Sequence, residues 1–405
     1  MENFTTPPSD PAESTITVSN HDVIESSHWI SHVPTNTFTD RPISEPIDIA
    51  SSLSTGPQDD SNSVVSVQAL SLSEDSKSIL YVLDSSPLFS SDSYHYSISL
   101  YFENVQPIFP LFRRDAFEAD LADNKIPEAL LCMMFALASR YVPGSELSRV
   151  FGPNMTEPWE YFARSGFRKS RFCDENDSDA PMSLEDIKTS FLLALHEYTS
   201  FPGRKAWMRV SNTVRVAVAA GLNRIDQPGR QNMFPMLDAE LEEWRLTWWA
   251  VWRVDSSINV LAGTPYNIET ADVFTALPSS STAMFTAGII PSSSRDFLPS
   301  DVIRPWNSAQ DLERIVSKDT AEFYYQTVSY NREAAICRRR LYSNPTPELM
   351  GEFNKLKQVL PYMRAALPDL FFSGVKLSTE ENSDRHRKRI ETLILVYMYV
   401  LDPPS

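Results

Sequence analysis

The sequence predicts an all-α protein, a multi-helix domain preceded by an acidic segment that does not pack. Three observations predict this. From about residue 93 onward, apolar side chains recur every three or four residues over long stretches. No stretch carries the alternating pattern and tight turn of a β-hairpin. The first 92 residues are instead rich in Ser, Thr, Pro and acidic residues, and such a composition buries too little apolar surface to fold.

Charge is distributed unevenly along the chain. The whole protein has a net charge of −17, and residues 1–92 hold fourteen Asp and Glu against only Arg41 and Lys77. Trp29 and Phe38 lie scattered among these acidic residues, a pattern also found in disordered activation segments; a merely solvating tail is the favoured interpretation, and an activation segment is the alternative. Residues 93–405 hold seven of the eight tryptophans, so we predict one large helical domain there.

Helix start and stop signals divide this domain. Ser183, followed three residues later by Asp186, forms an acidic variant of the capping box and predicts a helix start. Residues 277–310 show little periodicity and predict a long loop. The stripe from Leu349 to Leu367 is predicted to kink or break at Pro361. The first predicted helix lies around Ile98. The others cover residues 130–141, 183–201, 206–224, 240–262, 319–342 and 387–401.

Two neighbouring helices supply the candidate core. At 100° per residue, residues 206–224 place Trp207 on the same narrow arc as Val214 and Ala217. Residues 240–262 place Trp244, Trp248 and Trp252 on one side. We expect the two helices to lie side by side and to bury these aromatic side chains in a shared interior.

Asp255 lies in the middle of the second aromatic face. Burying a lone carboxylate costs several kcal/mol, so Asp255 requires a cation or a hydrogen-bond donor. Arg215, at the edge of the preceding stripe, is the first candidate partner, with Arg245 and Arg253 next. We predict an interhelical ion pair with a structural role; the alternative is a polar anchor in a ligand pocket between the helices.

Several classes of protein are disfavoured. Cys132, Cys173 and Cys337 are too few and too far apart for a disulfide framework or a multi-cysteine zinc site, and we predict no cofactor. The motifs of zinc proteases, serine hydrolases and nucleotide-binding loops are absent, so no catalytic residue is predicted and the chain is not expected to be an enzyme.

Membrane insertion and direct DNA binding are disfavoured as well. The most apolar run, Leu393–Leu401, is too short to cross a hydrocarbon core of about 30 Å, and residues 1–50 carry no secretory signal. A pI near 4.8 opposes contact with phosphates. The basic clusters at residues 338–340 and 385–389 are read as solvated helix faces, with nuclear import signals as the alternative.

A family resemblance covers about residues 101–278. The chain resembles the fungal-specific transcription factor domain, or middle homology region, of binuclear zinc cluster regulators. The resemblance begins with the strings YFENVQPIFPLFRRDAF and EALLCMMFALASRY. Its most specific positions, in order, are Trp207, Arg215, Ala217, Gly221, Leu222, Arg224, Glu242, Glu243, Arg245, Trp248, Trp249, Asp255, Gly263, Pro265 and Asp272.

The chain also departs from that family. Asn223 and Thr264 stand where the family commonly has histidine and arginine, and Trp244-Arg245-Leu246 stands in place of an arginine run, which indicates a divergent member. The family's N-terminal six-cysteine cluster is replaced here by the acidic segment, so we expect no sequence-specific DNA binding by the chain itself. The sequence also stops at a helix that the family follows with others; we expect either a shortened paralogue or an incomplete gene.

The resemblance implies a nuclear transcription regulator, with cytoplasmic residence as well, of the kind that governs metabolic or secondary-metabolite genes. It implies action through protein contacts, as a homodimer or as a heterodimer with zinc-cluster regulators, under a small-molecule effector. Two alternatives remain. One is a helical protein that binds or converts a metabolite between the Trp207 and Trp244 helices. The other is a scaffold that pairs with a full-length zinc-cluster regulator.

Overall fold

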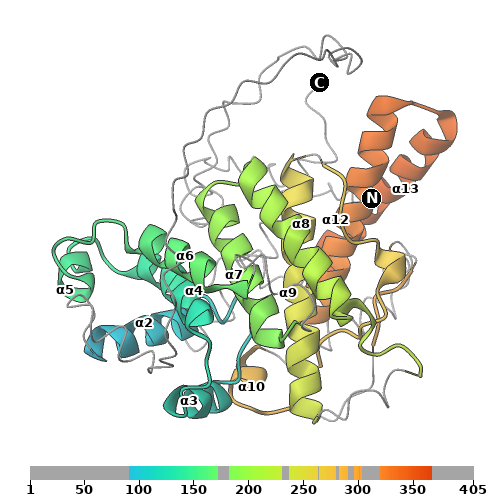
Figure 1. Cartoon of the computed structure of the whole chain (residues 1–405). Helices are drawn as coiled ribbons and strands as arrows, with labels where there is room; N and C mark the ends of the chain where they lie inside the picture. Colours follow the sequence, from blue (N-terminus) through green and yellow to red (C-terminus); the bar gives the residue numbers. More distant parts are fainter. Residues whose placement is uncertain are drawn as a thin grey trace, which may run out of the picture. The chain divides into compact units, whose positions relative to one another are not determined.

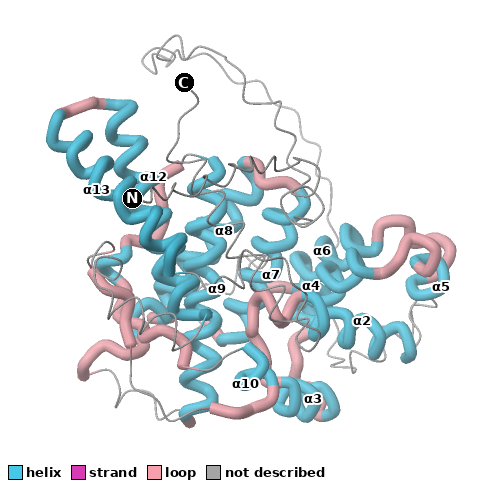
Figure 2. Tube along the Cα trace, turned by 180° about the vertical axis from the view of Figure 1, so that it is seen from behind, coloured by secondary structure: helices cyan, strands magenta, loops and turns pink. Residues whose placement is uncertain are grey.

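A computed structural model describes residues 91–171, 182–229, 237–262, 264–279, 282–290, 296–300, 302 and 320–366. Of the predicted acidic segment 1–92, only residues 91 and 92 are described. The predicted helix 387–401 and the basic cluster 385–389 lie outside the described residues. The domain boundary near residue 92 therefore stays a prediction. Every regular element in the described residues is a helix, so the all-α class is confirmed (Figure 2).

The described chain forms two compact units that divide near residue 300. The helices of the first unit follow one another closely in the chain (Figure 1). They are α2 (Ser91–Asn104), α3 (Arg114–Ala122), α4 (Glu128–Ala138), η1 (Ser139–Tyr141), α5 (Leu147–Phe151), α6 (Pro158–Lys169), α7 (Leu184–Ser200), α8 (Arg204–Ala219), η3 (Leu222–Arg224), α9 (Asp238–Ala262), η4 (Thr270–Asp272) and α10 (Thr282–Thr286). The second unit contains α12 (Thr320–Ser343) and α13 (Pro347–Ala366).

Helix α4 lies at the centre of one half of the first unit. After Glu128 it carries no charged residue, and every side chain from Ala129 to Ala138 is buried. Helices α2, α6 and α7 pack against it. The approach of α6 depends on Gly166, because a Cβ there would lie 2.8 Å from Met133 Sδ. The predicted core helix at 130–141 is thus confirmed, with its last residues wound as η1.

Helix α7 begins where the capping signal predicts. Ser183 Oγ accepts a hydrogen bond from the Asp186 amide at 3.1 Å, and Asp186 Oδ2 accepts one from the Ser183 amide at 3.0 Å. This reciprocal pair satisfies two amides that a helix start otherwise leaves unpaired. The cap thereby fixes the position at which α7 enters the core.

Helices α8 and α9 pack against each other, as the sequence predicts. Trp248 and Trp252 are fully buried, whereas Trp207 and Trp244 are only half-buried. The single predicted stripe missed Trp249, which is also fully buried. The reason is that α9 is covered by α7 and α8 and also by the segment after η4, where Ala276 O accepts a 2.7 Å hydrogen bond from Trp249 Nε1.

The predicted long loop at 277–310 is partly wrong. Residues 282–286 form α10, and Phe285 on this short helix is fully buried. Thr286 Oγ1 accepts a 3.2 Å hydrogen bond from Gln106 Nε2, which attaches α10 to the chain after α2. One buried aromatic residue in a five-residue helix is too short a signal to show as periodicity.

The second unit is a helical hairpin. The Tyr330 hydroxyl donates to Leu356 O, and Cys337 Sγ donates to Leu349 O at 3.7 Å, so α12 and α13 contact along their length. Helix α12 matches the predicted helix 319–342. Helix α13 continues through Pro361 to Ala366, so the helix does not end at this proline, and the predicted break there is wrong. None of the helices in the described ranges is long and apolar enough to span a bilayer.

Candidate functional site

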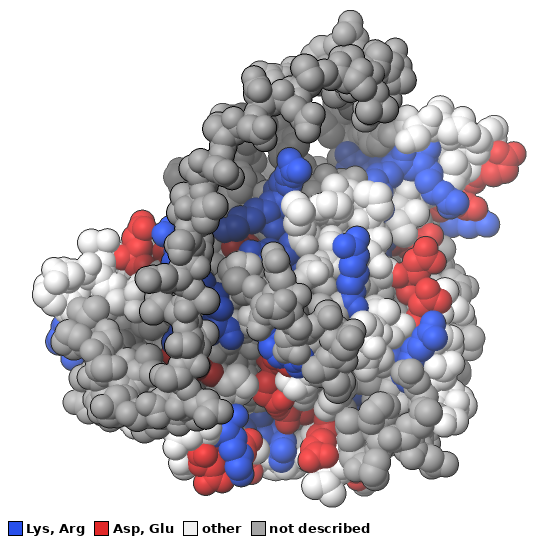
Figure 3. Space-filling view, in the orientation of Figure 1, with Lys and Arg blue, Asp and Glu red and all other residues white. Residues whose placement is uncertain are grey.

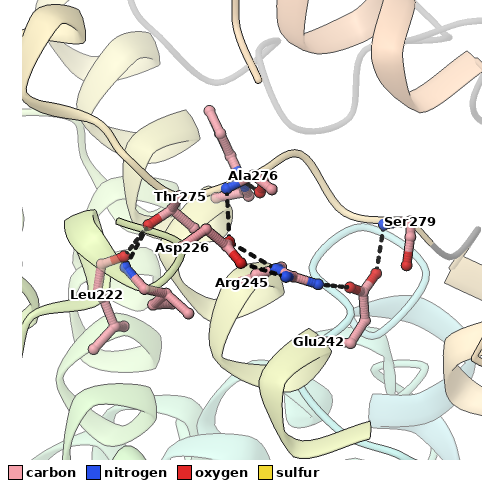
Figure 4. A network of polar contacts seen from close by, with 9 residues as sticks. Leu222, Asp226, Glu242, Arg245, Thr275, Ala276 and Ser279 are labelled. Carbon is pink, nitrogen blue, oxygen red and sulfur yellow. Dashed lines mark hydrogen bonds and ion pairs between the residues drawn. The ribbon is translucent and has the colours of Figure 1, made fainter. Parts of the chain in front are cut away.

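A buried ionic network lies where α9 meets the chain after α8 (Figure 4). Gly221 has φ +83°, a left-handed conformation that glycine adopts without strain, and it turns the chain from α8 into η3. Asp226 follows η3. The segment after η4 runs alongside: the Phe274 amide donates to Asn223 O at 2.7 Å, and the Asp226 amide donates to Phe274 O at 3.1 Å.

Arg245 of α9 lies at the centre of this network. Its Nε donates to Asp226 Oδ2 at 2.9 Å, and its Nη2 contacts the other oxygen of the same carboxylate. Its Nη1 lies 3.3 Å from Glu242 Oε2. The carboxylates also accept hydrogen bonds from backbone amides. The Ala276 amide donates to Asp226 at 2.9 Å, and the Ser279 amide donates to Glu242 at 2.6 Å. The network therefore fastens residues 276–279 to α9.

The charges in this network are almost completely removed from solvent. The Asp226 and Glu242 side chains are 1% and 0% exposed. Burial opposes the positive charge of Arg245, but the hydrogen bond and charge of Asp226, followed by those of Glu242, raise its pKa above the usual value. A guanidinium held on both sides by carboxylates stays charged and immobile, which suits a structural clamp.

Asp255 forms a second buried network, and its partners differ from those predicted. It accepts hydrogen bonds from Asn259 Nδ2 at 2.7 Å and Asn267 Nδ2 at 2.8 Å, and from the amides of Asn267 and Ile268 at 3.2 and 3.3 Å. Asn259 Oδ1 in turn accepts from Trp207 Nε1 at 2.9 Å. The network thus joins α8, α9 and the chain that follows α9.

The predicted ion pair between Arg215 and Asp255 is wrong. Arg215 is exposed on α8, whereas Asp255 is fully buried, and the structure does not bring the two together. Arg245 pairs instead with Asp226, and Arg253 donates to Ile108 O at 2.7 Å with its guanidinium 4.7 Å above the Phe109 ring. Four hydrogen-bond donors contact the Asp255 carboxylate where the sequence analysis predicted the Arg215 guanidinium. The requirement for a partner is confirmed, and the choice of Arg215 is wrong.

A cleft of about 410 Å³ lies beside Trp244. Lys188, whose side chain is 2% exposed, binds Glu243, and Arg113 Nε lies 3.5 Å from the same carboxylate. Lys188 Nζ also lies 4.6 Å from the centre of the Phe112 ring. The lining residues are Phe112, Arg113, Ala116, Phe117, Asp120, Ile126, Leu130, Ser183, Leu184, Glu185, Lys188, Glu240, Glu243 and Trp244. This cleft does not include Arg215 or Asp255, where the sequence placed a pocket.

His196 is a buried group that neither network uses. Its side chain, on α7, is buried, and neither ring nitrogen has a hydrogen-bond partner in the described chain. Burial, then the charges of Arg140 and Lys205, lower the pKa of His196 from 6.5 to about 3. His196 is therefore neutral in the folded protein at neutral pH.

This depressed pKa predicts a loss of stability in mild acid. Unfolded histidine gains a proton below pH 6.5 while folded His196 does not, so stability falls as the pH drops below that value. We expect His196 to account for about 2 kcal/mol of the loss in unfolding free energy between pH 7.5 and pH 5. The His196→Leu variant should lack this share in urea denaturation at the two pH values. The matched control is the same substitution at an exposed histidine, His95→Leu.

A comparison of the sequence with known families identifies the domain. The profile of the family described as "Fungal specific transcription factor domain" matches residues 98–389, well over half of the chain. The chain belongs to this family. The sequence-based resemblance is thereby confirmed, and the matched range extends beyond the predicted 101–278.

One curated relative agrees with this family assignment. The transcription factor domain is similar to "Transcription factor tazR" of Aspergillus terreus, with 22% identity over 188 residues. The match covers 44% of this chain and 28% of that protein, so the chain matches less than a third of its relative's length. No solved structure matches the domain.

Several positions that carry the resemblance lie in the two networks. Arg245, Glu242 and Asp255 are among them, and Trp207 contacts the second network through Asn259. The sequence analysis did not identify Asp226 as the partner of Arg245, nor Asn259 and Asn267 as partners of Asp255. Asn259 could have been found, because it lies one helical turn after Asp255 on α9. Within the described residues, no group of three or more His, Cys, Asp or Glu side chains is placed to hold a metal ion.

Proposed function

We propose that this chain is a nuclear transcription regulator that acts through protein contacts of its helical domain and controls metabolic or secondary-metabolite genes. The observation that carries the proposal is the family match over residues 98–389, supported by the curated relative, which is a transcription factor. We propose further that the chain is not an enzyme and that it assembles as a homodimer or with a zinc-cluster regulator.

The chemistry of the domain favours protein contacts over DNA contacts and catalysis. Arg245 and Lys188, two buried cations, are held by Asp226 and Glu243, so their charges are already used within the fold. The net charge of the whole chain, −17, opposes a phosphate backbone, whose contacts supply most of the affinity of DNA-binding proteins; twelve of these negative charges lie in residues 1–92 and five in residues 93–405. Exposed side chains are then the groups through which the domain can recognise partners.

Deleting the gene and measuring all transcripts tests the proposal. A coherent set of metabolic genes should change in the deletion strain and recover when the wild-type chain is restored. A fluorescent fusion should accumulate in the nucleus. A chain carrying Arg114→Met, at an exposed ion pair outside both networks, should restore expression as well as the wild type does.

Two results would contradict the proposal and favour the alternatives. An unchanged transcriptome together with an accumulated metabolite would favour an enzyme or metabolite-binding protein. Restoration of the transcript set in the deletion strain by overproducing a co-purifying zinc-cluster regulator alone would favour a scaffold role, in which this chain only assembles with the DNA-reading protein.

The cleft beside Trp244 favours effector binding as a second role of the same domain. Its lining contains buried Phe117, Ile126 and Leu130, while Asp120, Glu185 and Glu240 add carboxylates beyond the one that Arg113 and Lys188 already contact. This combination fits a small molecule with an apolar body and a cationic group. Ala116→Trp would fill the cleft and should abolish the rise in melting temperature that a cell-extract fraction containing the effector gives to the wild-type chain. An equal rise in both proteins would exclude this cleft.

A further inference from the structure

Helix α8 presents a basic stripe on its exposed face. Between Gly203 and Ile225 the chain has five basic residues and no acidic one, whereas residues 93–405 as a whole carry a net charge of −5. At 100° per residue the exposed residues of α8 fall within one arc. Figure 3 shows Lys and Arg atoms along the course of α8 with uncharged atoms between them. The exposed residues, which we call the α8 stripe, are Arg204, Lys205, Met208, Asn212, Arg215, Val218 and Ala219.

Two neighbouring helices hold α8 with this stripe outward. On the opposite side of α8, Trp207 Nε1 donates to Asn259 Oδ1 of α9 at 2.9 Å. Thr213 Oγ1 lies 2.8 Å from Ser190 Oγ of α7, within hydrogen-bond distance. All three helices belong to the first unit. The α8 stripe is therefore held in one orientation on an exposed face of that unit.

The charges on the stripe are only partly neutralised. Lys205 Nζ lies 2.6 Å from Glu197 Oε1, whereas Arg204 and Arg215 make no ion pair with any described residue. A solvated helix face ordinarily pairs its cations with carboxylates one turn away, as it does on α3. Because α8 contains no carboxylate, two arginines about 16 Å apart along the helix axis present positive charge to a partner.

Exposed apolar side chains lie between these cations. Met208 is 55% exposed and Val218 is 43% exposed, and both belong to the arc that contains the two arginines. Apolar area left in water lowers its free energy when a partner's apolar surface covers it. The α8 stripe is therefore complementary to a surface that combines carboxylates with apolar side chains.

The spacing along the stripe selects a helix as this partner. Arg204 and Arg215 are eleven residues apart and Met208 and Val218 are ten, so both kinds of group recur after about three helical turns. A second helix repeats its carboxylates and apolar residues at the same spacing on one face. In an extended chain about 16 Å corresponds to about five residues, and residues five apart point to opposite sides of a strand. One face of an extended chain therefore cannot meet both arginines.

We propose that the α8 stripe binds an acidic amphipathic helix of another protein. Carboxylates on one face of that helix contact the two arginines, and apolar side chains between them contact Met208 and Val218. A second copy of α8 does not fit, because symmetric pairing would bring like charges together. A phosphate backbone does not fit either, because it offers the two exposed apolar side chains no apolar surface. The inference rests on the proposed function, since it names the surface and the partner class of the protein contacts through which the regulator acts.

Binding of a defined peptide to the whole chain tests this proposal. The probe is a fluorescein-labelled helical peptide, about as long as α8, with glutamates and leucines on one face, and fluorescence anisotropy measures its affinity. R204E/R215E should weaken binding about tenfold or more, and 0.5 M salt should do the same, because exposed charges are screened over a few ångströms there. Met208→Ser should weaken binding about threefold. The melting temperature of each variant should match that of the wild type, since the substituted side chains are exposed.

A matched control separates the stripe from net charge. Arg114 on α3 and Arg149 on α5 are exposed as well, and R114E/R149E changes the net charge of the chain by the same amount. The affinity of this variant for the peptide should stay within about twofold of the wild type. A peptide with lysines in place of its glutamates should bind R204E/R215E but not the wild type. Equal losses in the two double variants would overturn the proposal.

Photocrosslinking in living cells identifies the class of the partner. A benzophenone amino acid in place of Met208 should give adducts with other proteins at segments that alternate carboxylates and apolar residues, and R204E/R215E should abolish them. Adducts only with nucleic acid, within the chain itself or between two of its copies would overturn the proposal. Neither experiment measures transcripts, so this inference can fail while the gene-deletion experiment succeeds.

Discussion

Replacing Arg245 with Met is expected to lower the free energy of unfolding of the first unit, which contains α9, by about 3–5 kcal/mol. The variant removes the guanidinium that Asp226 and Glu242 share, and both carboxylates are almost entirely buried. Each carboxylate would lose its buried cation, although the backbone amides of Ala276 and Ser279 still donate to them. Urea denaturation followed by tryptophan fluorescence measures the loss.

Two controls separate this effect from the loss of a surface arginine. Arg114 pairs with Glu118 on α3, but the two side chains are 48% and 56% exposed, so Arg114→Met should change the unfolding free energy by less than about 0.5 kcal/mol. Adding Asp226→Asn and Glu242→Gln to Arg245→Met should recover part of the stability. Equal small losses at Arg245 and Arg114 would show that the network is not a clamp.

Local signals in the sequence located most helices of the described chain. The Ser183 cap placed the start of α7, and the run of apolar residues after Glu128 placed α4. The core of α9 was recovered only in part. A one-stripe projection assumes one buried face, whereas α9 is covered on several, so Trp249 was missed and the burial of Trp244 was overestimated. Which faces are covered depends on the return of residues 274–279, and no local pattern encodes that return.

The polar sites were harder to predict than the core. Sequence reasoning correctly required a partner for Asp255 but chose Arg215, because both fall near the facing stripes. The actual donors include the amides of Asn267 and Ile268, twelve and thirteen residues further along the chain. Arg245 was chosen as a candidate without its true partner, Asp226, which precedes α9. Such partners depend on the path of connecting segments, and helical spacing says nothing about that path.

Replacing Asp255 with Leu is expected to cost about 3 kcal/mol or more, because it leaves buried donors on Asn259, Asn267 and Ile268 without their acceptor. Asp255→Asn keeps one acceptor oxygen and should cost less, about 1–2 kcal/mol. The melting of both variants, measured by circular dichroism, orders the two losses. If Asp255→Leu lowered the stability no more than Asp255→Asn does, the result would contradict the arrangement of four donors around Asp255.

A double-mutant cycle decides between the predicted and the observed partners of Asp255. If Arg215 formed an ion pair with Asp255, combining Arg215→Ala with Asp255→Asn would show a coupling energy of about 1.5 kcal/mol or more. Because Arg215 is exposed and apart from Asp255, we expect coupling below about 0.5 kcal/mol. Asn267→Ala with Asp255→Asn should instead be strongly coupled, since Asn267 Nδ2 donates directly to Oδ1 of Asp255. The loop after α9, and not the neighbouring helix, would then be what holds this carboxylate in the core, with Arg215 left exposed on α8.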